Sequence, residues 1–158
     1  MHAKRLTIQG HHFSRIIESL MEKGVSAKFR TTGNSMLPTI RNKDIIVVSP
    51  FRARQPKQGD VVAISQGPGC PVIIHRILKI KNKQFLIKGD SCLKYDGLFP
   101  RESILGFVSG IERRQKEIPL DKLTAKRNII LSKYRFFYFH RLADRFKRIL
   151  IISENPSQ

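Results

Sequence analysis

The sequence contains no tryptophan, only two cysteines, and 12 acidic residues against 30 lysines and arginines. Cys70 and Cys92 lie in neither a CxxC pair nor another metal-ligand spacing, which argues against a disulfide framework and a zinc site. We therefore expect reduced thiols, no metal and no cofactor. No apolar segment reaches the roughly 18–20 residues that span a bilayer, and the first residues do not have the pattern of a secretory signal.

The shortage of acidic residues leaves a formal net charge of +18. Such an excess attracts phosphate, anionic lipid head groups or acidic partners, and the charge alone does not choose among them. A hydrophobic content of 41% in 158 residues argues against a wholly disordered chain and is sufficient for one domain with a core.

Hydrophobic periodicity predicts a mainly β domain with an N-terminal helix and a basic amphipathic C-terminal helix. Residues 12–23 carry an apolar stripe at helical spacing, and Gly24 supplies a stop signal. Residues 27–31 have the character of a short strand. Between residues 44 and 110, turn-forming segments separate five strand-like runs, which are DIIVVS, DVVAIS, VIIHRILKI, QFLIKG and ILGFVSG.

The longest of these runs, residues 72–80, carries His75. Alternation along a strand places His75 on the less apolar face, with Ile74 and Arg76 on the other. The short segment at 81–83 predicts a hairpin with the next run.

Three regions are predicted along the chain: a helical segment at 1–28, a β domain at 29–118 and a basic tail at 119–158. Within the tail, residues 122–150 contain nine lysines or arginines and one acidic residue, with apolar and basic side chains on separate helical stripes. Such a helix can pack on the β domain or lie on an anionic membrane surface, and both roles remain open.

Residues 31–40, TTGNSMLPTI, have no apolar periodicity and place Ser35 just ahead of the first long strand-like run. Four further motifs follow in order: GDVVAI, the His-Arg pair at 75–76, KGDSCLKYD and ILGFV. Together they resemble the type I signal peptidase family, within the clan that also contains the LexA-type self-cleaving repressors. The first box is similar to that family's Gly-x-Ser-Met-x-Pro-Thr signature. The His-Arg pair and the Lys-Gly-Asp box resemble its endoplasmic-reticulum branch.

The resemblance implies a serine endopeptidase of signal-peptidase/LexA-like fold. Ser35 would be the nucleophile, His75 the general base and Asp96 the carboxylate that orients the imidazole, with Asp90 as a supporting or substitute carboxylate. The backbone N–H of Ser35 is the expected oxyanion donor. The other expected site residues are Gly33, Met36 and Pro38 beside the substrate, and Arg76, Lys88 and Gly89 in support.

The implied partner is a polypeptide precursor that loses a leader or signal-like segment. The family's N-terminal membrane anchor is not found in this sequence. We therefore expect a cytoplasmic protein with peripheral contact to anionic membrane through residues 122–150.

Three alternatives use the same residues differently. A self-cleaving repressor would carry a helix-turn-helix domain and an Ala-Gly or Cys-Gly bond ahead of Ser35, but the preceding segment is short and contains no such pair. A non-catalytic basic β domain could bind nucleic acid or an acidic partner, with the aromatic cluster at 134–141 stacking on bases. That hypothesis leaves the serine, histidine and aspartate boxes unexplained. The third alternative is a relative of these peptidases that keeps the fold and has lost the activity.

Overall fold

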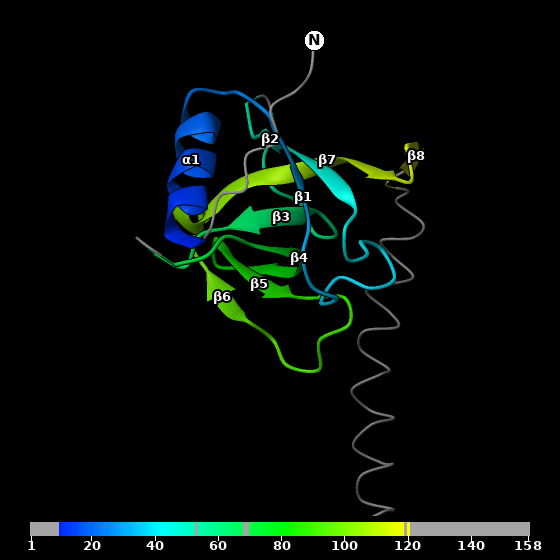
Figure 1. The fold of residues 1–158 in the computed structure, drawn as a ribbon. Coiled ribbons are helices and arrows are strands. Elements are labelled where there is room, and N and C mark those ends of the chain that lie inside the picture. Colours follow the sequence, from blue (N-terminus) through cyan, green and yellow to red (C-terminus); the bar gives the residue numbers. More distant parts are fainter. Residues whose placement is uncertain (1–9, 53, 68–69, 119, 121–158) are drawn as a thin grey trace, which may run out of the picture.

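The computed structural model describes residues 10–52, 54–67, 70–118 and 120. Its main element is one sheet of eight strands, with one α-helix at its side (Figure 1). The predicted mainly β fold with an N-terminal helix is therefore confirmed. Within the described part, no helix is long and apolar enough to cross a membrane. The C-terminal helix predicted at 122–150 lies outside the described residues, and the division into three regions stays a prediction.

The helix α1 spans Gly10–Glu22, close to its predicted bounds. The helix ends in a Schellman motif, in which Val25 N–H donates to Leu20 O at 2.8 Å and Gly24 N–H donates to Met21 O at 3.0 Å. Gly24 has φ +72°, a left-handed conformation that glycine adopts without steric cost. The predicted stop signal is thus confirmed, and it acts through backbone conformation.

All pairings in the sheet are antiparallel. The strand order is β1-β2-β7-β3-β4-β5-β6, and β8 pairs with β7 outside this path. The predicted short strand is β1, and the five predicted runs correspond to β2, β3, β4, β5 and β7. The strand bounds are Ala27–Arg30 for β1, Ile45–Pro50 for β2, Val61–Ile64 for β3, Ile73–Lys81 for β4, Gln84–Lys88 for β5, Gly97–Phe99 for β6, Ile104–Arg113 for β7 and Lys116–Ile118 for β8.

Two strands were not predicted. The sequence predicts a connection throughout 90–102, but residues 97–99 pair with β5 as the strand β6. The strand β8 follows β7 across a tight turn. Each has only three residues, which is too few to produce a periodic signal, so tertiary pairing decides their conformation.

The predicted hairpin joins β4 to β5 through a two-residue loop. Lys81 pairs with Gln84, and Asn82 and Lys83 between them have φ angles of 50° and 60°. Positive φ at both loop positions is typical of a type I′ turn, whose twist matches that of the flanking strands.

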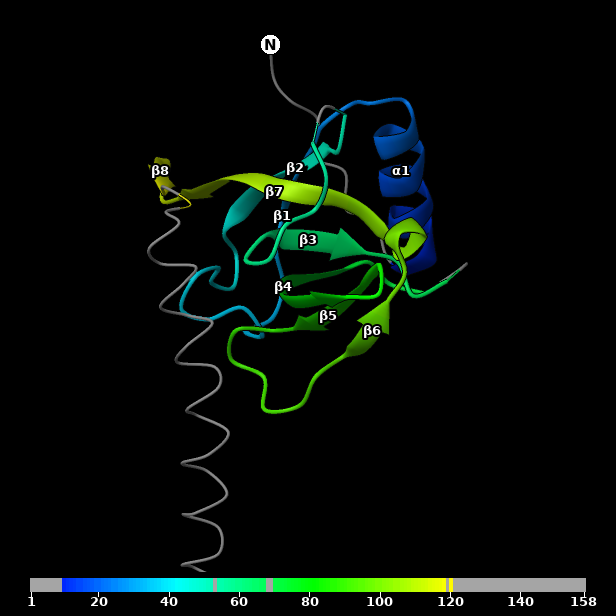
Figure 2. The ribbon, with the colours of Figure 1, turned by 180° about the vertical axis from the view of Figure 1, so that it is seen from behind.

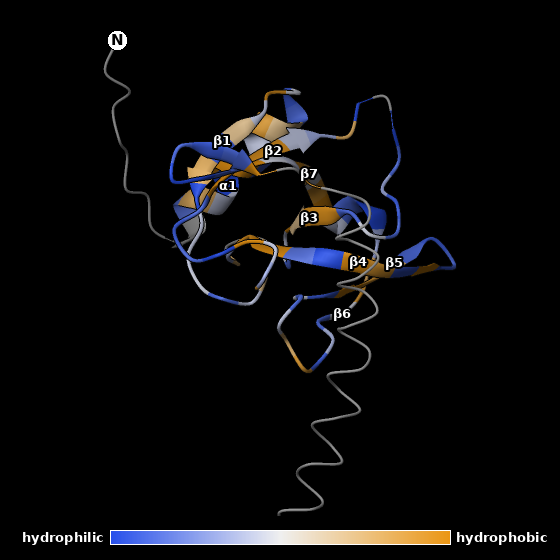
Figure 3. Cartoon of the chain, turned by 90° about the vertical axis from the view of Figure 1, so that its right-hand side faces the viewer, coloured by the Kyte–Doolittle hydropathy of each residue, from blue (hydrophilic) through white to orange (hydrophobic). Residues whose placement is uncertain are grey.

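Apolar side chains pack against both faces of the sheet. Alternate residues of β3 belong to two different core clusters, Val61 and Ala63 to one and Val62 and Ile64 to the other. The first cluster includes the inner side of α1. Figure 3 shows hydrophobic segments along the strands and hydrophilic ones mainly in the connections, with a hydrophilic stretch also in the middle of β4.

This double coverage corrects one expectation for β4. The sequence places His75 on the less apolar face of this strand together with Ile77, but His75 is only 8% exposed and Ile77 is fully buried. The four residues 75–78 are all buried in succession. Alternation therefore does not separate a solvent face from a core face here, because the second core cluster covers the side that carries Ile77.

The strand β7 joins two parts of the sheet. It pairs with β2 on one side and with β3 on the other, so that the β1–β2 part and the β3–β6 part meet along it (Figure 2). The first part leads into and out of the serine box, and the second carries His75.

Candidate active site

Ser35, His75 and Asp96 lie in one chain of contacts. Ser35 is in the turn segment between β1 and β2, His75 is on β4, and Asp96 directly precedes β6. Ser35 Oγ is 2.9 Å from His75 Nε2, and Asp96 Oδ2 is 2.6 Å from His75 Nδ1. An imidazole that donates its Nδ1–H to the carboxylate leaves Nε2 free to accept the serine proton. The arrangement can therefore activate a hydroxyl for attack.

Gly89 makes room for this array. A Cβ at position 89 would lie 2.7 Å from Ser35 O, 2.9 Å from His75 Nε2 and 2.6 Å from Cys92 Sγ. Distances below 3.0 Å are shorter than real Cβ contacts, so any side chain at this position would displace the serine segment or the imidazole. The glycine of the Lys-Gly-Asp box thus has a steric role at the site.

The two candidate carboxylates take different positions. Asp90 does not contact His75; instead its two oxygens pair with Arg76, Oδ1 with Nε and Oδ2 with Nη2, both at 2.7 Å. The two side chains are 1% and 2% exposed. Thr39 Oγ1 donates to Asp90 Oδ2 at 2.5 Å. This buried pair ties the end of the serine segment to β4 and leaves Asp96 as the partner of the histidine.

A second ion pair holds the same segment from its other side. Arg113 of β7 donates to both oxygens of Asp44, at 2.9 Å from Nε to Oδ1 and 2.7 Å from Nη2 to Oδ2, and also to Thr39 O at 3.2 Å. Burial raises the pKa of the Asp44 carboxyl, but the Arg113 hydrogen bonds, the Arg41 N–H and the two positive charges outweigh it and lower the pKa. Asp44 is thereby held in its ionised form.

Other predicted residues lie around this centre. Gly33 has φ +92°, and a Cβ there would meet no atom within 4 Å. Met36 is buried, and its Sδ accepts from Asp90 N–H at 3.5 Å. Pro38 is exposed and follows a cis peptide bond. Lys88 is buried, with its Nζ 5.5 Å from the centre of the Tyr95 ring.

A groove opens beside the serine and the histidine, with a volume of about 310 Å³. Its walls are mainly apolar, and Arg30 of β1 is the charged side chain in its lining. Phe13 of α1 and Phe29 of β1 meet edge to face across a ring-centre distance of 4.9 Å. The groove is lined by Phe13, Phe29, Arg30, Thr31, Thr32, Gly33, Ser35, Met36, Ile40, Val72, Ile73, Ile74 and His75.

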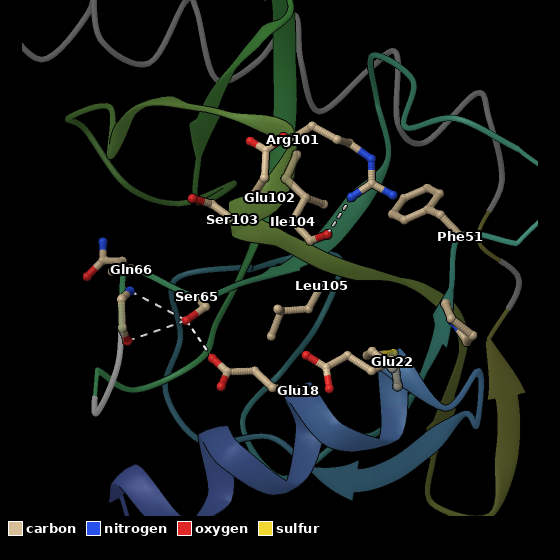
Figure 4. Close-up of a pocket in the computed structure, with 13 residues that line it drawn as sticks. Glu18, Glu22, Phe51, Ser65, Gln66, Arg101, Glu102, Ser103, Ile104 and Leu105 are labelled. Atoms are coloured by element: carbon tan, nitrogen blue, oxygen red, sulfur yellow. Dashed lines mark hydrogen bonds between the residues drawn. The ribbon is translucent and has the colours of Figure 1, made fainter.

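A larger hollow of about 520 Å³ lies away from these residues, between α1 and the segment 101–105 (Figure 4). Its polar lining includes the carboxylates of Glu18, Glu22 and Glu102, and Ser65 Oγ donates to Glu18 at 2.7 Å. None of Ser35, His75 and Asp96 lines it. The volume of a hollow therefore does not identify the candidate catalytic centre, whereas the side-chain geometry does.

The thiol nearest the serine is that of Cys92. Its Sγ lies 4.0 Å from Ser35 O, and burial together with the negative charge of Asp96 raises its pKa. Cys92 and Cys70 are both free thiols. The described residues contain no group of three histidine, cysteine or acidic side chains that could hold a metal ion.

One residue at the site was missed by the sequence analysis. Ser91 N–H donates to Ser35 O at 2.9 Å, and Ser91 Oγ donates to Asn34 O at 2.6 Å. The available signal was its position directly after Asp90 in the KGDSCLKYD box, but nothing in a single serine distinguishes a structural contact from an ordinary turn.

An antiparallel sheet that presents a serine, a histidine and an aspartate in this order of contacts has the geometry of a serine-peptidase centre. The chain belongs to the Peptidase S24-like family, whose model matches residues 6–95, more than half of the sequence. This agrees at the level of the clan with the resemblance carried by the sequence motifs. No curated protein matches the chain.

Proposed function

We propose that this protein is a serine endopeptidase in which Ser35, His75 and Asp96 carry out the reaction. The observation that supports this most directly is the pair of contacts on the two nitrogens of His75, Ser35 Oγ at 2.9 Å and Asp96 at 2.6 Å. An ordinary surface histidine is solvated at its ring nitrogens. His75 is instead 8% exposed, with a hydroxyl at one ring nitrogen and a carboxylate at the other.

The reaction follows from these positions. Ser35 Oγ attacks the peptide carbonyl while its proton moves to His75 Nε2, and the backbone N–H of Ser35 stabilises the oxyanion. The C–N bond then breaks as His75 returns the proton to the leaving amine, which leaves an acyl group on Ser35. Water attacks this ester, gives its proton to Nε2, and the proton returns to Ser35 Oγ as the acid is released. Asp96 stabilises the imidazolium in both halves.

The groove and the sheet edge favour an extended polypeptide as the substrate. Among the described strands β1 pairs only with β2, so its other edge carries no described strand, and Phe29 and Arg30 of β1 line the groove. An extended segment can add to such an edge through backbone hydrogen bonds while alternate side chains enter the apolar groove. This arrangement fits cleavage within a chain.

The narrower proposal is the removal of a leader or signal-like segment from a precursor, in the manner of the endoplasmic-reticulum branch of signal peptidases. It rests on the serine box, the His-Arg pair and the Lys-Gly-Asp box. The formal charge of +18 and the basic residues at 122–150 support peripheral contact with anionic membrane as part of the same proposal. Those residues lie outside the described part of the chain.

The test is acylation of Ser35 by a fluorophosphonate, which reacts with activated serines without any need for the natural substrate. We expect stoichiometric labelling of the native protein, none of Ser35→Ala, and greatly slowed labelling of His75→Ala. Ser109→Ala is the matched control, because Ser109 lies on β7 and its hydroxyl forms hydrogen bonds with Ser49 Oγ and Val47 O, away from the three candidate catalytic residues.

Two other measurements separate the alternatives. Self-cleavage, as in the repressors of the clan, would appear as a change in intact mass that Ser35→Ala abolishes. A non-catalytic binding protein would show no labelling while folded, together with salt-sensitive binding to nucleic acid that Ser35→Ala leaves unchanged. Either the absence of labelling or equal labelling of Ser35→Ala would contradict the proposal.

A further inference from the structure

We propose that Ser91 is a positioning residue that aims the backbone N–H of Ser35 at the oxyanion. This inference rests on the proposed function. Ser91 donates to both carbonyls that flank the serine: its Oγ to Asn34 O at 2.6 Å and its N–H to Ser35 O at 2.9 Å. A single residue of the loop after β5 therefore fixes the peptide groups on both sides of Ser35.

The first of these bonds determines where the oxyanion donor points. The peptide bond between Asn34 and Ser35 is trans, since Leu37–Pro38 is the cis bond in the described chain. In a planar trans peptide the N–H and the preceding C=O point in opposite directions. Because Ser91 Oγ holds the Asn34 carbonyl, the Ser35 N–H points away from Ser91. Among the described residues, none accepts a hydrogen bond from this N–H.

The peptide group needs such support because its own surroundings provide little. Gly33 has no side chain and occupies a left-handed conformation, and Asn34 is exposed. The only other donor to Asn34 O in the described chain is Leu37 N–H at 3.1 Å, a bond within the same turn. Ser91 is the contact that ties this peptide to a different part of the fold, beside the buried Asp90.

The contact to Ser35 O is independent of the Ser91 side chain, so a substitution can separate the two bonds. Ser91→Ala removes the hydroxyl and keeps the N–H, which leaves Ser35 O bonded while the Asn34–Ser35 peptide loses its outside partner. Ser91→Thr keeps a hydroxyl on Cβ. Loss of one oxyanion donor typically lowers a rate by about 10²–10³. A donor that is retained but points in the wrong direction should lower the rate by a smaller factor.

The experiment measures the second-order rate of fluorophosphonate labelling, because the phosphonyl oxygen occupies the position of the oxyanion. We expect Ser91→Ala to label about tenfold more slowly than the native protein, and Ser91→Thr to recover most of the rate. The ratio of the native rate to the Ser91→Ala rate should be the same at every pH, since the substitution leaves His75 and Asp96 in place. Thermal unfolding of each variant shows whether the fold is retained.

The outcomes are distinct for the two proposals. A native protein that does not label contradicts the proposed function, and this inference with it. Native and Ser91→Ala proteins that label at the same rate overturn the inference alone. A shift in the pH dependence of the labelling rate of Ser91→Ala would overturn the inference as well, because Ser91 would then act through His75. The inference would also be overturned if Ser91→Thr labelled as slowly as Ser91→Ala while its unfolding temperature equalled that of the native protein.

Discussion

Asp96 contacts the imidazole of His75 at 2.6 Å, whereas Asp90 of the same loop is bound to Arg76 and does not contact the histidine. The sequence resemblance gives Asp96 the orienting role and keeps Asp90 as a supporting or substitute carboxylate, and in the fold the two carboxylates face different partners. Substitutions at these two positions should therefore affect different properties of the protein.

Asp96→Asn should lower the rate of fluorophosphonate labelling by roughly 10²–10⁴, because an amide does not stabilise the imidazolium or its required tautomer. The free energy of unfolding should change little, because Asp96 is an exposed residue and asparagine keeps the shape of its side chain. Labelling kinetics and urea denaturation check the two statements. If Asp96→Asn labelled at the rate of the native protein, Asp96 would be excluded as the carboxylate that supports the base.

Asp90→Asn should instead lower the free energy of unfolding by about 3–5 kcal/mol, because it leaves the buried Arg76 guanidinium without its charge partner. Urea denaturation measures this directly. Molecules that remain folded should retain more of the labelling rate than Asp96→Asn does. An unchanged unfolding free energy would contradict the structural role of the pair.

Gly89→Ala should reduce labelling about a hundredfold, since the new Cβ displaces Ser35 O or the imidazole and a misplacement of about 1 Å has effects of this size. Overpacking should also lower the unfolding free energy by about 1–3 kcal/mol. Gly110→Ala is the matched control, because its Cβ would lie 3.8 Å from the Val47 side chain, an ordinary contact. Equal behaviour of the two variants would refute the steric argument.

The labelling rate should fall as the pH is lowered from 8 to 5. A general base must be neutral to accept a proton, so the labelling rate should fall as solvent protons compete with the Ser35 hydroxyl for His75 Nε2. His75 is the side chain that carries this dependence. A rate that stays constant from pH 5 to 8 would argue against His75 as the base.

The ion pair of Asp44 with Arg113 should contribute a pH-dependent part of the stability. The pKa of Asp44 is lowered in the folded state, so the contribution is fully present above the unfolded value of about 3.9 and is lost as the pH falls through the folded pKa. Asp44→Asn should therefore unfold at a lower temperature than the native protein at pH 7. The difference should shrink below pH 4. A difference that persists at pH 2 would contradict this assignment.

The sequence was sufficient for the elements whose signals are long or chemically distinctive. The five β runs are long enough to show their character, and Ser35 and His75 lie in boxes whose order is informative in itself. The choice between Asp90 and Asp96 depends on how the loop after β5 folds over β4, which local pattern does not encode. The contacts of Ser91 depend on the same loop, and they are long-range in sequence.

The position of β7 in the sheet has a consequence for the order of events during synthesis. Ser35, His75 and Asp96 have all been made once residue 96 is reached, yet β7, which pairs with β2 and β3 and joins the two parts of the sheet, begins at Ile104. A chain shorter than this contains all three side chains but lacks the strand that joins the part of the sheet leading to Ser35 with the part that carries His75. Assembly of these three side chains therefore depends on completion of the sheet, and it cannot precede the synthesis of β7.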